Sequence, residues 1–198
     1  MQPLAERMRP TRLADYLGQE HLVGEGSVLR QALAAGFLPS IILWGPPGVG
    51  KTTLANILAT ELGRPFYSLS AIAAGVKDVR DTIQKAEQQR FFNRPNPILF
   101  IDEIHRFSKS QQDALLGAVE KGVITLMGAT TENPSFEVIP ALLSRCQVYV
   151  LKLLETDQLL QLIQEALHKD EYLRDKKVRF ESYDAMLHYS GGDARKLY

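Results

Sequence analysis

Hydrophobic positions along the first 150 residues alternate between two patterns. Short runs of the kind that form buried strands occur at residues 41–44, 64–70, 98–103, 123–130 and 148–151. Between them, apolar residues recur at helical spacing in residues 51–63, 75–91 and 110–121, and the two prolines of the loop "NRPNP" end the second helix. Strands that alternate with such helices predict an α/β fold with a five-stranded, mainly parallel sheet, whose ligands bind beyond the carboxyl ends of its strands.

The strand pattern stops near residue 153. The stretches "DQLLQLIQEALHKD" and "SYDAMLHYS" have the spacing of amphipathic helices, and Asp193 is a good N-cap for a further helix. That helix reaches the end of the chain after five residues, which is too short for stability on its own. We therefore expect an α/β core at residues 1–152 and a partial helical lid at residues 153–198.

The stretch "GPPGVGKT" lies between the first predicted strand and the first predicted helix. It matches the pattern GxxxxGK[ST], in which backbone amides surround the β-phosphate of a nucleotide, Lys51 reaches the β/γ oxygens and Thr52 holds Mg²⁺. A plain glycine turn is the alternative, but it needs neither Lys nor Thr at these positions. The predicted nucleotide-binding residues are Gly45, Pro46, Pro47, Gly48, Val49, Gly50, Lys51, Thr52 and Thr53.

Two adjacent acids end the apolar strand in "ILFIDE". Asp102 supplies the carboxylate that a metal-bound triphosphate needs, and Glu103 is placed to polarise water as a general base. Helix capping or surface charge is the alternative for both. Since switch GTPases position water with glutamine, the Asp-Glu pair favours an ATPase over a switch.

The composition adds few further sites. Lys and Arg (23) balance Asp and Glu (23), so the overall charge does not indicate binding to nucleic acid or membranes. No apolar run approaches the roughly 18 residues that span a bilayer, which favours a soluble intracellular protein. The lone Cys146 is interpreted as a packing residue. The histidines His21, His105, His168 and His188 share no metal-ligand spacing, so we interpret them as surface or packing residues.

Beyond the nucleotide motifs, the chain resembles the clamp-loader-like group of AAA+ ATPases. "RMRPTRLADYLGQEHLVG" resembles the N-terminal segment that packs on adenine, "GATTEN" the sensor 1 strand end, "LLSRC" the arginine-finger box and "GGDAR" the sensor 2 box of the lid. The combination of "DEIHRFSKSQQDALL" with "GATTENPSFEVIPALLSR" is similar to the RarA/MgsA family, which includes the eukaryotic Werner-helicase-interacting protein. Clamp-loader subunits and the Holliday-junction motor RuvB each share only some of these motifs.

The resemblance implies roles for individual residues. Thr130 is assigned to sensor 1, with Thr131 and Asn133 as alternative candidates. A threonine that only ends the strand is the alternative interpretation. Arg145 is assigned as an arginine finger for the neighbouring subunit, and a residue in a surface salt bridge is the alternative interpretation. Arg195 is assigned to contact the γ-phosphate from the lid of the same subunit, and a cation on an exposed helix is the alternative interpretation. Arg106, Lys109 and Lys121 are candidates for DNA phosphates, and a solvated helix face explains them equally well.

The resemblance also implies a function. It predicts an oligomeric, DNA-stimulated ATPase with ATP and Mg²⁺ that acts at replication forks, gaps or DNA ends and contacts single-strand-binding protein. The expected compartment is the cytoplasm, at the nucleoid, in bacteria and the nucleus in eukaryotes, with no membrane partner. A clamp-loader or Holliday-junction motor subunit and a scaffold with little hydrolysis are the alternatives. Members of the family continue into a C-terminal oligomerisation domain, so we expect this chain to be an N-terminal fragment.

Overall fold

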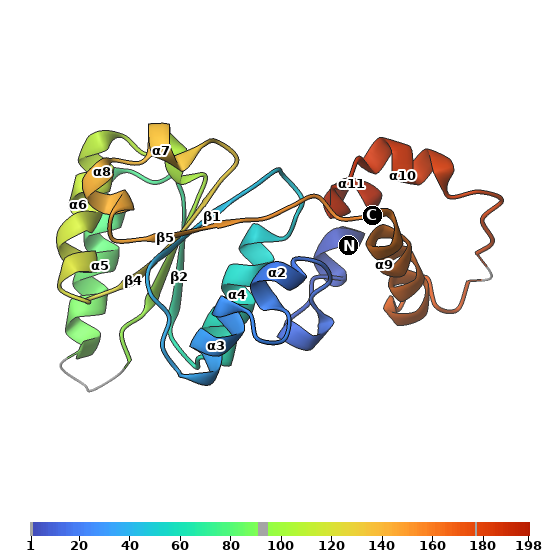
Figure 1. Cartoon of the computed structure of the whole chain (residues 1–198), viewed down its shortest axis with the longest axis horizontal. Helices are drawn as coiled ribbons and strands as arrows, with labels where there is room; N and C mark the ends of the chain where they lie inside the picture. The colour runs from blue at the N-terminus through green and yellow to red at the C-terminus, as the bar shows by residue number, and fades with distance from the viewer. Residues whose placement is uncertain (1, 91–94, 177) are drawn as a thin grey trace.

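A five-stranded parallel sheet lies at the centre of the computed structural model, which describes residues 2–90, 95–176 and 178–198 (Figure 1). The strands lie in the order β2-β3-β4-β1-β5, and each neighbouring pair is parallel. The predicted α/β fold with five strands is confirmed. The strands are β1 (Ile41–Trp44), β2 (Phe66–Ser70), β3 (Ile98–Asp102), β4 (Thr125–Thr130) and β5 (Gln147–Val150).

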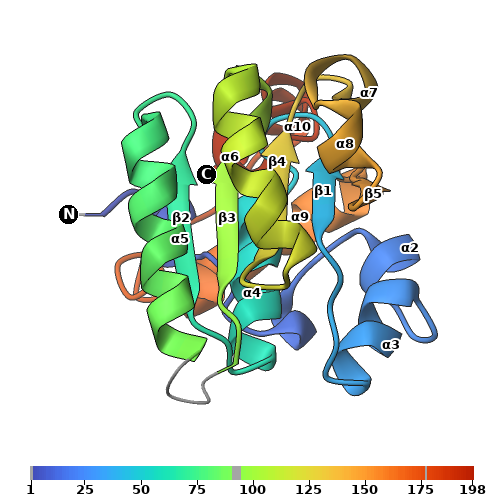
Figure 2. The same ribbon diagram turned by 90° about the vertical axis from the view of Figure 1, so that its left-hand side faces the viewer.

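Helices cover both faces of the sheet (Figure 2). One face packs against α4 (Lys51–Glu61) and the other against α5 (Val76–Arg90) and α6 (Lys109–Glu120). Alternate residues of each inner strand enter the two cores, so that Ile41 and Ile42 are both fully buried on opposite faces. Burial on both faces explains why these strands are continuous apolar runs rather than alternating ones.

The end of β3 and the start of α6 are joined by η2 (Ile104–Arg106). Ser108 then caps α6, because its hydroxyl accepts from the Gln111 amide at 3.3 Å and the Gln111 side chain accepts from the Ser108 amide at 2.9 Å. The helix therefore begins one residue before the predicted start at residue 110. Residues 91, 93 and 94 of the predicted helix end and "NRPNP" loop lie outside the described residues.

Several short helical segments are absent from the sequence prediction because each is too short to show a helical period. Four precede β1, in a region that the pattern describes only as a polar start, and two lie between β4 and β5. They are α1 (Leu4–Arg7), η1 (Leu13–Asp15), α2 (Glu20–Val23), α3 (Val28–Ala34), α7 (Pro134–Glu137) and α8 (Pro140–Leu143).

Three helices follow the sheet and have a small core of their own: α9 (Thr156–Lys169), α10 (Asp184–Ser190) and α11 (Ala194–Leu197). The last helix forms despite its length. The Asp193 carboxylate accepts from the amides of Arg195 and Lys196 at 2.8 and 3.2 Å, and Leu197 is buried against α9. A cap and tertiary packing thus replace the helix length that the sequence lacks. The division into two domains at residue 152 stays a prediction.

Across the part of the chain that the structure describes, no helix is both long and apolar enough to cross a bilayer.

Candidate nucleotide-binding site

A cavity of about 370 Å³ lies beyond the carboxyl ends of the strands, between the sheet and the helices α9 and α11. Its walls come from the N-terminal segment, the glycine loop, the end of β3 and the two helices. This is the edge of the sheet at which parallel α/β folds bind ligands. The predicted residues that line it are Gly48, Val49, Gly50, Lys51, Thr52, Thr53, Asp102, Glu103 and Arg195.

The glycine loop is shaped by what packs against it. Gly48 and Gly50 have φ angles of 71° and 92°, which residues other than glycine rarely adopt. A methyl group at Gly48 would overlap the carboxylate of Asp193, and one at Gly50 would lie 2.8 Å from the hydroxyl of Tyr16. The Ala194 amide also donates to the Gly48 carbonyl at 3.2 Å. Helix α11 is therefore docked on the loop, with Asp193 at the contact.

Lys51 begins α4 and is only 7 % exposed. Its ammonium donates to the carbonyls of Gly45 and Pro46, both at 2.7 Å. Burial lowers the pKa of Lys51 below its ordinary value, and the carboxylates of Glu103 and Asp102 oppose that shift. Gly45 and Pro46 thus hold the lysine rather than lining the cavity, and Pro47 does not line it either.

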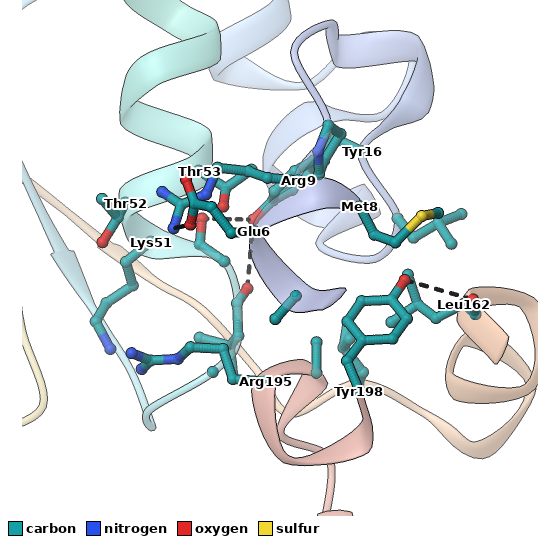
Figure 3. Close-up of a pocket in the computed structure, with 18 of the residues that line it drawn as sticks. Glu6, Met8, Arg9, Tyr16, Lys51, Thr52, Thr53, Leu162, Arg195 and Tyr198 are labelled. Atoms are coloured by element: carbon teal, nitrogen blue, oxygen red, sulfur yellow. Dashed lines mark hydrogen bonds and ion pairs between the residues drawn. The ribbon is translucent and has the colours of Figure 1, made fainter. Parts of the chain in front are cut away.

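Arg195 approaches the same place from α11. Figure 3 shows its guanidinium and the Lys51 ammonium extending to one side of the cavity. The positive charge of Arg195 lowers the pKa of Lys51 further, which means that the two cations repel. A polyanion between them would relieve that repulsion. The two acids Asp102 and Glu103 line the same cavity and interact electrostatically with Lys51, so the cavity holds both positive and negative groups.

Glu103 leaves the sheet in a left-handed conformation, with φ 56° and ψ 47°. Such a backbone costs a residue other than glycine about 1–2 kcal/mol. The turn accompanies a contact that the sequence did not predict. The carboxylate Oε2 of Glu103 lies 3.3 Å from Nδ1 of His105, and the same Nδ1 lies 3.0 Å from the hydroxyl of Thr130. The ring of His105 thus packs against two polar side chains, Glu103 and Thr130, which the sequence did not indicate.

The three sensor 1 candidates differ in their contacts. Thr130 is fully buried at the end of β4, and its hydroxyl also contacts the backbone carbonyl and amide of Glu132, at 3.1 and 3.0 Å. The Asn133 side chain caps α7 by accepting from the Ser135 amide. Neither residue lines the cavity, and neither does Thr131.

Arg145 lies away from the cavity, after α8. Its guanidinium pairs with Glu120, at the end of α6, with an Nη2–Oε1 distance of 2.5 Å, and donates to the Ala141 carbonyl at 2.6 Å. Both members of the ion pair are about 40 % exposed. The pair also offsets an acid at a helix C-terminus, where a negative charge is unfavourable. The surface salt bridge considered for Arg145 is thus present in this structure.

Residues at the other end of the cavity were not singled out by the sequence. They include Pro3, Met8 and Pro10 of the N-terminal segment, together with Leu162 of α9 and Tyr198 at the chain end. In Figure 3 the Tyr198 ring faces the cavity, and its hydroxyl donates to the Leu162 carbonyl at 3.4 Å. Burial raises the pKa of Tyr198 to about 12. The only sequence signal for this region was the resemblance of residues 7–24 to an adenine-packing segment.

An ion pair joins the N-terminal segment to the lid helices. Arg7 contacts both oxygens of Asp170, at 2.6 and 3.1 Å, and its guanidinium lies 4.9 Å from the centre of the Tyr172 ring. The Asp170 side chain is only 1 % exposed. This two-point geometry holds two walls of the cavity together although the residues are 163 positions apart.

Comparison with known proteins agrees with this geometry. Residues 41–153 match the model of the ATPase family associated with various cellular activities (AAA). The chain belongs to the AAA family of ATPases. It is 48 % identical to the replication-associated recombination protein A of Haemophilus influenzae and 46 % identical to the ATPase WRNIP1 of Dictyostelium discoideum, each over 98 % of this chain. The resemblance to the RarA and Werner-helicase-interacting group is thereby confirmed.

The fold is also found in solved structures. The Holliday junction branch migration motor RuvB of Thermotoga maritima matches with a TM-score of 0.76 and 29 % identity, covering 96 % of this chain and 62 % of that one. The chain spans 44 % of the H. influenzae relative and 22 % of the D. discoideum one. What those whole proteins do is therefore a matter of proposal for this chain.

Proposed function

We propose that the cavity binds ATP with Mg²⁺ and hydrolyses it to ADP and phosphate. The observation that carries this proposal is that Lys51, Thr52, Asp102, Glu103 and Arg195 converge on one cavity from three separate parts of the chain. Two mutually repelling cations face two carboxylates there, which suits a triphosphate with a bound divalent cation.

The residues divide between binding and chemistry. The amides of the glycine loop and the start of α4 hold the phosphates, and Lys51 exchanges its two carbonyl partners for the β/γ oxygens. Arg195 contacts the γ-phosphate from the lid. Glu103 takes a proton from a water whose oxygen attacks the γ-phosphorus, and the bond from that phosphorus to the β–γ bridging oxygen breaks as ADP leaves.

The oxygen donors present fit Mg²⁺. The Thr52 hydroxyl and the Asp102 carboxylate line the same cavity, and Mg²⁺ prefers such donors together with phosphate oxygens. The ion would neutralise charge that develops on the phosphoryl oxygens.

Sensor 1 is proposed to be Thr130, acting through its contact with His105 rather than at the phosphate itself. Thr130→Val should then lower ATP turnover. Thr131→Val is the matched control and should leave turnover unchanged. If only the Thr131 change lowers turnover, the assignment moves to Thr131.

We propose that Arg145 completes the site of a neighbouring subunit, because it does not line the cavity of its own chain. Assembly then requires Arg145 to leave Glu120. Arg145→Ala should reduce hydrolysis about 10³-fold with nucleotide binding intact, the scale of an arginine finger supplied in trans. Mixing Arg145→Ala subunits with Lys51→Ala subunits should restore part of the activity. Co-assembled mixtures that remain inactive would show that Arg145 does not act in trans.

We further propose that the full-length protein is a homo-oligomeric ATPase that DNA stimulates at forks, gaps or ends during replication-associated recombination and repair. The named relatives support this reading. Single-strand-binding protein is the proposed protein partner. The proposed location is where the DNA lies, in the cytoplasm of a bacterium or the nucleus of a eukaryote. Arg106 and Lys109, which flank the start of α6, are the proposed phosphate contacts.

The experiment is ATP turnover by the full-length protein with single-stranded, duplex, gapped and forked DNA, with and without excess chelator. We expect turnover to require Mg²⁺ and to rise with one class of DNA structure. Negligible turnover under every condition would contradict the proposal and favour the scaffold alternative. Turnover without DNA stimulation would leave the ATPase standing and remove the DNA role.

A further inference from the structure

His105 occupies a position between the proposed general base and the buried end of β4. Its ring is only 12 % exposed and presents one nitrogen, Nδ1, to both Glu103 and Thr130. Among the described residues, the imidazole is the one side chain within hydrogen-bond or ion-pair distance of the Glu103 carboxylate. The carboxylate itself lines the cavity and is 28 % exposed.

The donor and acceptor properties of the Glu103 carboxylate, the His105 ring and the Thr130 hydroxyl determine which atoms carry the hydrogens. An ionised carboxylate only accepts, so Nδ1 must carry a hydrogen wherever it faces Oε2 of Glu103. Nδ1 makes a hydrogen bond of 3.0 Å with the Thr130 hydroxyl, and Oε2 of Glu103 lies 3.3 Å from the same nitrogen as an ion-pair contact. The Thr130 hydroxyl hydrogen is then free for the Glu132 carbonyl at 3.1 Å, and its oxygen also accepts from the Glu132 amide. The ring is therefore fixed on a fully buried hydroxyl that is itself held by backbone.

We propose that His105 is a positioning residue that holds Oε2 of Glu103 and leaves Oε1 directed to the water. This inference rests on the proposed ATPase function and deepens it. Glu103 follows the end of β3 in a left-handed conformation, so strand geometry does not set the direction of its carboxylate. A side-chain partner is needed to hold that direction. His105 also links the base mechanically to β4 and the segment after it, through Thr130 and Glu132.

The test uses three variants of His105 in the full-length protein. His105→Asn keeps an amide donor near the Nδ1 position, and His105→Leu keeps apolar volume without a donor. We expect His105→Leu to lower kcat by up to about 100-fold, the scale of a small misplacement of a catalytic group, while KM and the Kd for ADP stay the same. His105→Asn should keep kcat within about threefold of wild type. The third variant is the double change His105→Leu with Glu103→Gln.

The double variant separates this inference from the proposed function. If His105 acts through Glu103, single-turnover hydrolysis by the double variant should equal that of Glu103→Gln alone. Equal losses of kcat in the Leu and Asn variants, or an added loss in the double variant, would overturn the positioning role. A rise in kcat in His105→Leu would also overturn it, because the ring would then restrain the base. Normal turnover by Glu103→Gln alone would instead refute Glu103 as the base.

Discussion

The two ends of the nucleotide cavity are built in different ways. The phosphate end, formed by residues 48–53 with Asp102, Glu103 and Arg195, takes most of its groups from one loop and one strand end. The distal end is assembled from segments far apart in the sequence, and it includes Pro3, Met8, Pro10, Leu162, Glu165 and Tyr198. At the phosphate end the spacing of residues brings most of the groups together, and the docking of α11 on Gly48 adds Arg195, whereas the distal end depends on tertiary contacts throughout.

The difference is visible in what holds each end together. The glycine loop relies on its own backbone conformation, on the Lys51 bonds to two carbonyls of the same loop, and on the Asp193 and Tyr16 side chains that pack against it. The distal end relies on the Arg7–Asp170 ion pair across 163 positions and on the Gln19 side chain. The amide of Gln19 bonds both the carbonyl and the amide of Lys152, at 2.7 and 2.9 Å, in the connection to α9. Changes at the phosphate end should therefore affect binding directly, and changes at the distal end should affect it through the lid.

The largest effect is expected from Lys51→Ala. This change removes the ammonium that the β/γ oxygens would contact, and nucleotide affinity should fall by about 100-fold or more, as for the loss of a strong charge-assisted bond. Titration with a fluorescent ATP analogue measures it. Lys85→Ala, at an exposed position of α5, is the matched control and should bind as wild type does. Affinity of wild-type strength in Lys51→Ala would show that the loop does not bind phosphates.

An intermediate effect is expected where the lid meets the loop. Gly48→Ala introduces a methyl group into the Asp193 carboxylate at a φ angle that alanine adopts poorly, so α11 must move away from the loop. We expect nucleotide affinity to fall by roughly 10-fold and the melting temperature to drop. Gly117→Ala is the control, because this glycine lies in α6 with open space around it and the change should stabilise the protein slightly. Equal behaviour of the two variants would mean that the docked lid is not needed.

The smallest effect on binding is expected from Arg7→Ala at the distal end. Loss of the ion pair leaves the Asp170 carboxylate buried without its partner, so the lid should loosen and nucleotide affinity should fall by about threefold. Arg12→Ala, which breaks an exposed ion pair with Asp15, is the control and should change little. An Arg7→Ala protein whose lid exchanges amide hydrogens at the wild-type rate would contradict this role for the pair.

The same ion pair predicts a dependence on pH. The bond from Arg7 holds the pKa of Asp170 below its ordinary value. A group with a lowered pKa in the folded state stabilises it above the ordinary value, and that contribution is lost as the pH falls through the folded pKa. The melting temperature should therefore fall more steeply below about pH 4 in the wild type than in Asp170→Asn. Parallel acid profiles would exclude this contribution.

The sequence predicted much of the phosphate end because its signals are local. The strand Ile41–Trp44, the glycine loop and the acids Asp102 and Glu103 follow one another at spacings that parallel α/β folds impose. It did not predict the partner of Glu103, because Thr130 reaches His105 only when β4 pairs with β3. The short N-terminal helices and the walls of the distal end were missed for the same reason, since tertiary contacts position them.

Glu103→Gln distinguishes a phosphate end that performs chemistry from one that only binds nucleotide. The change keeps the shape of the side chain and removes its basicity. We expect ATP to bind with wild-type affinity while single-turnover hydrolysis in the full-length protein falls by about 10²-fold or more. Glu25→Gln, at an exposed position outside the cavity, should hydrolyse ATP at the wild-type rate. Hydrolysis at the wild-type rate in Glu103→Gln would show that Glu103 is not the general base.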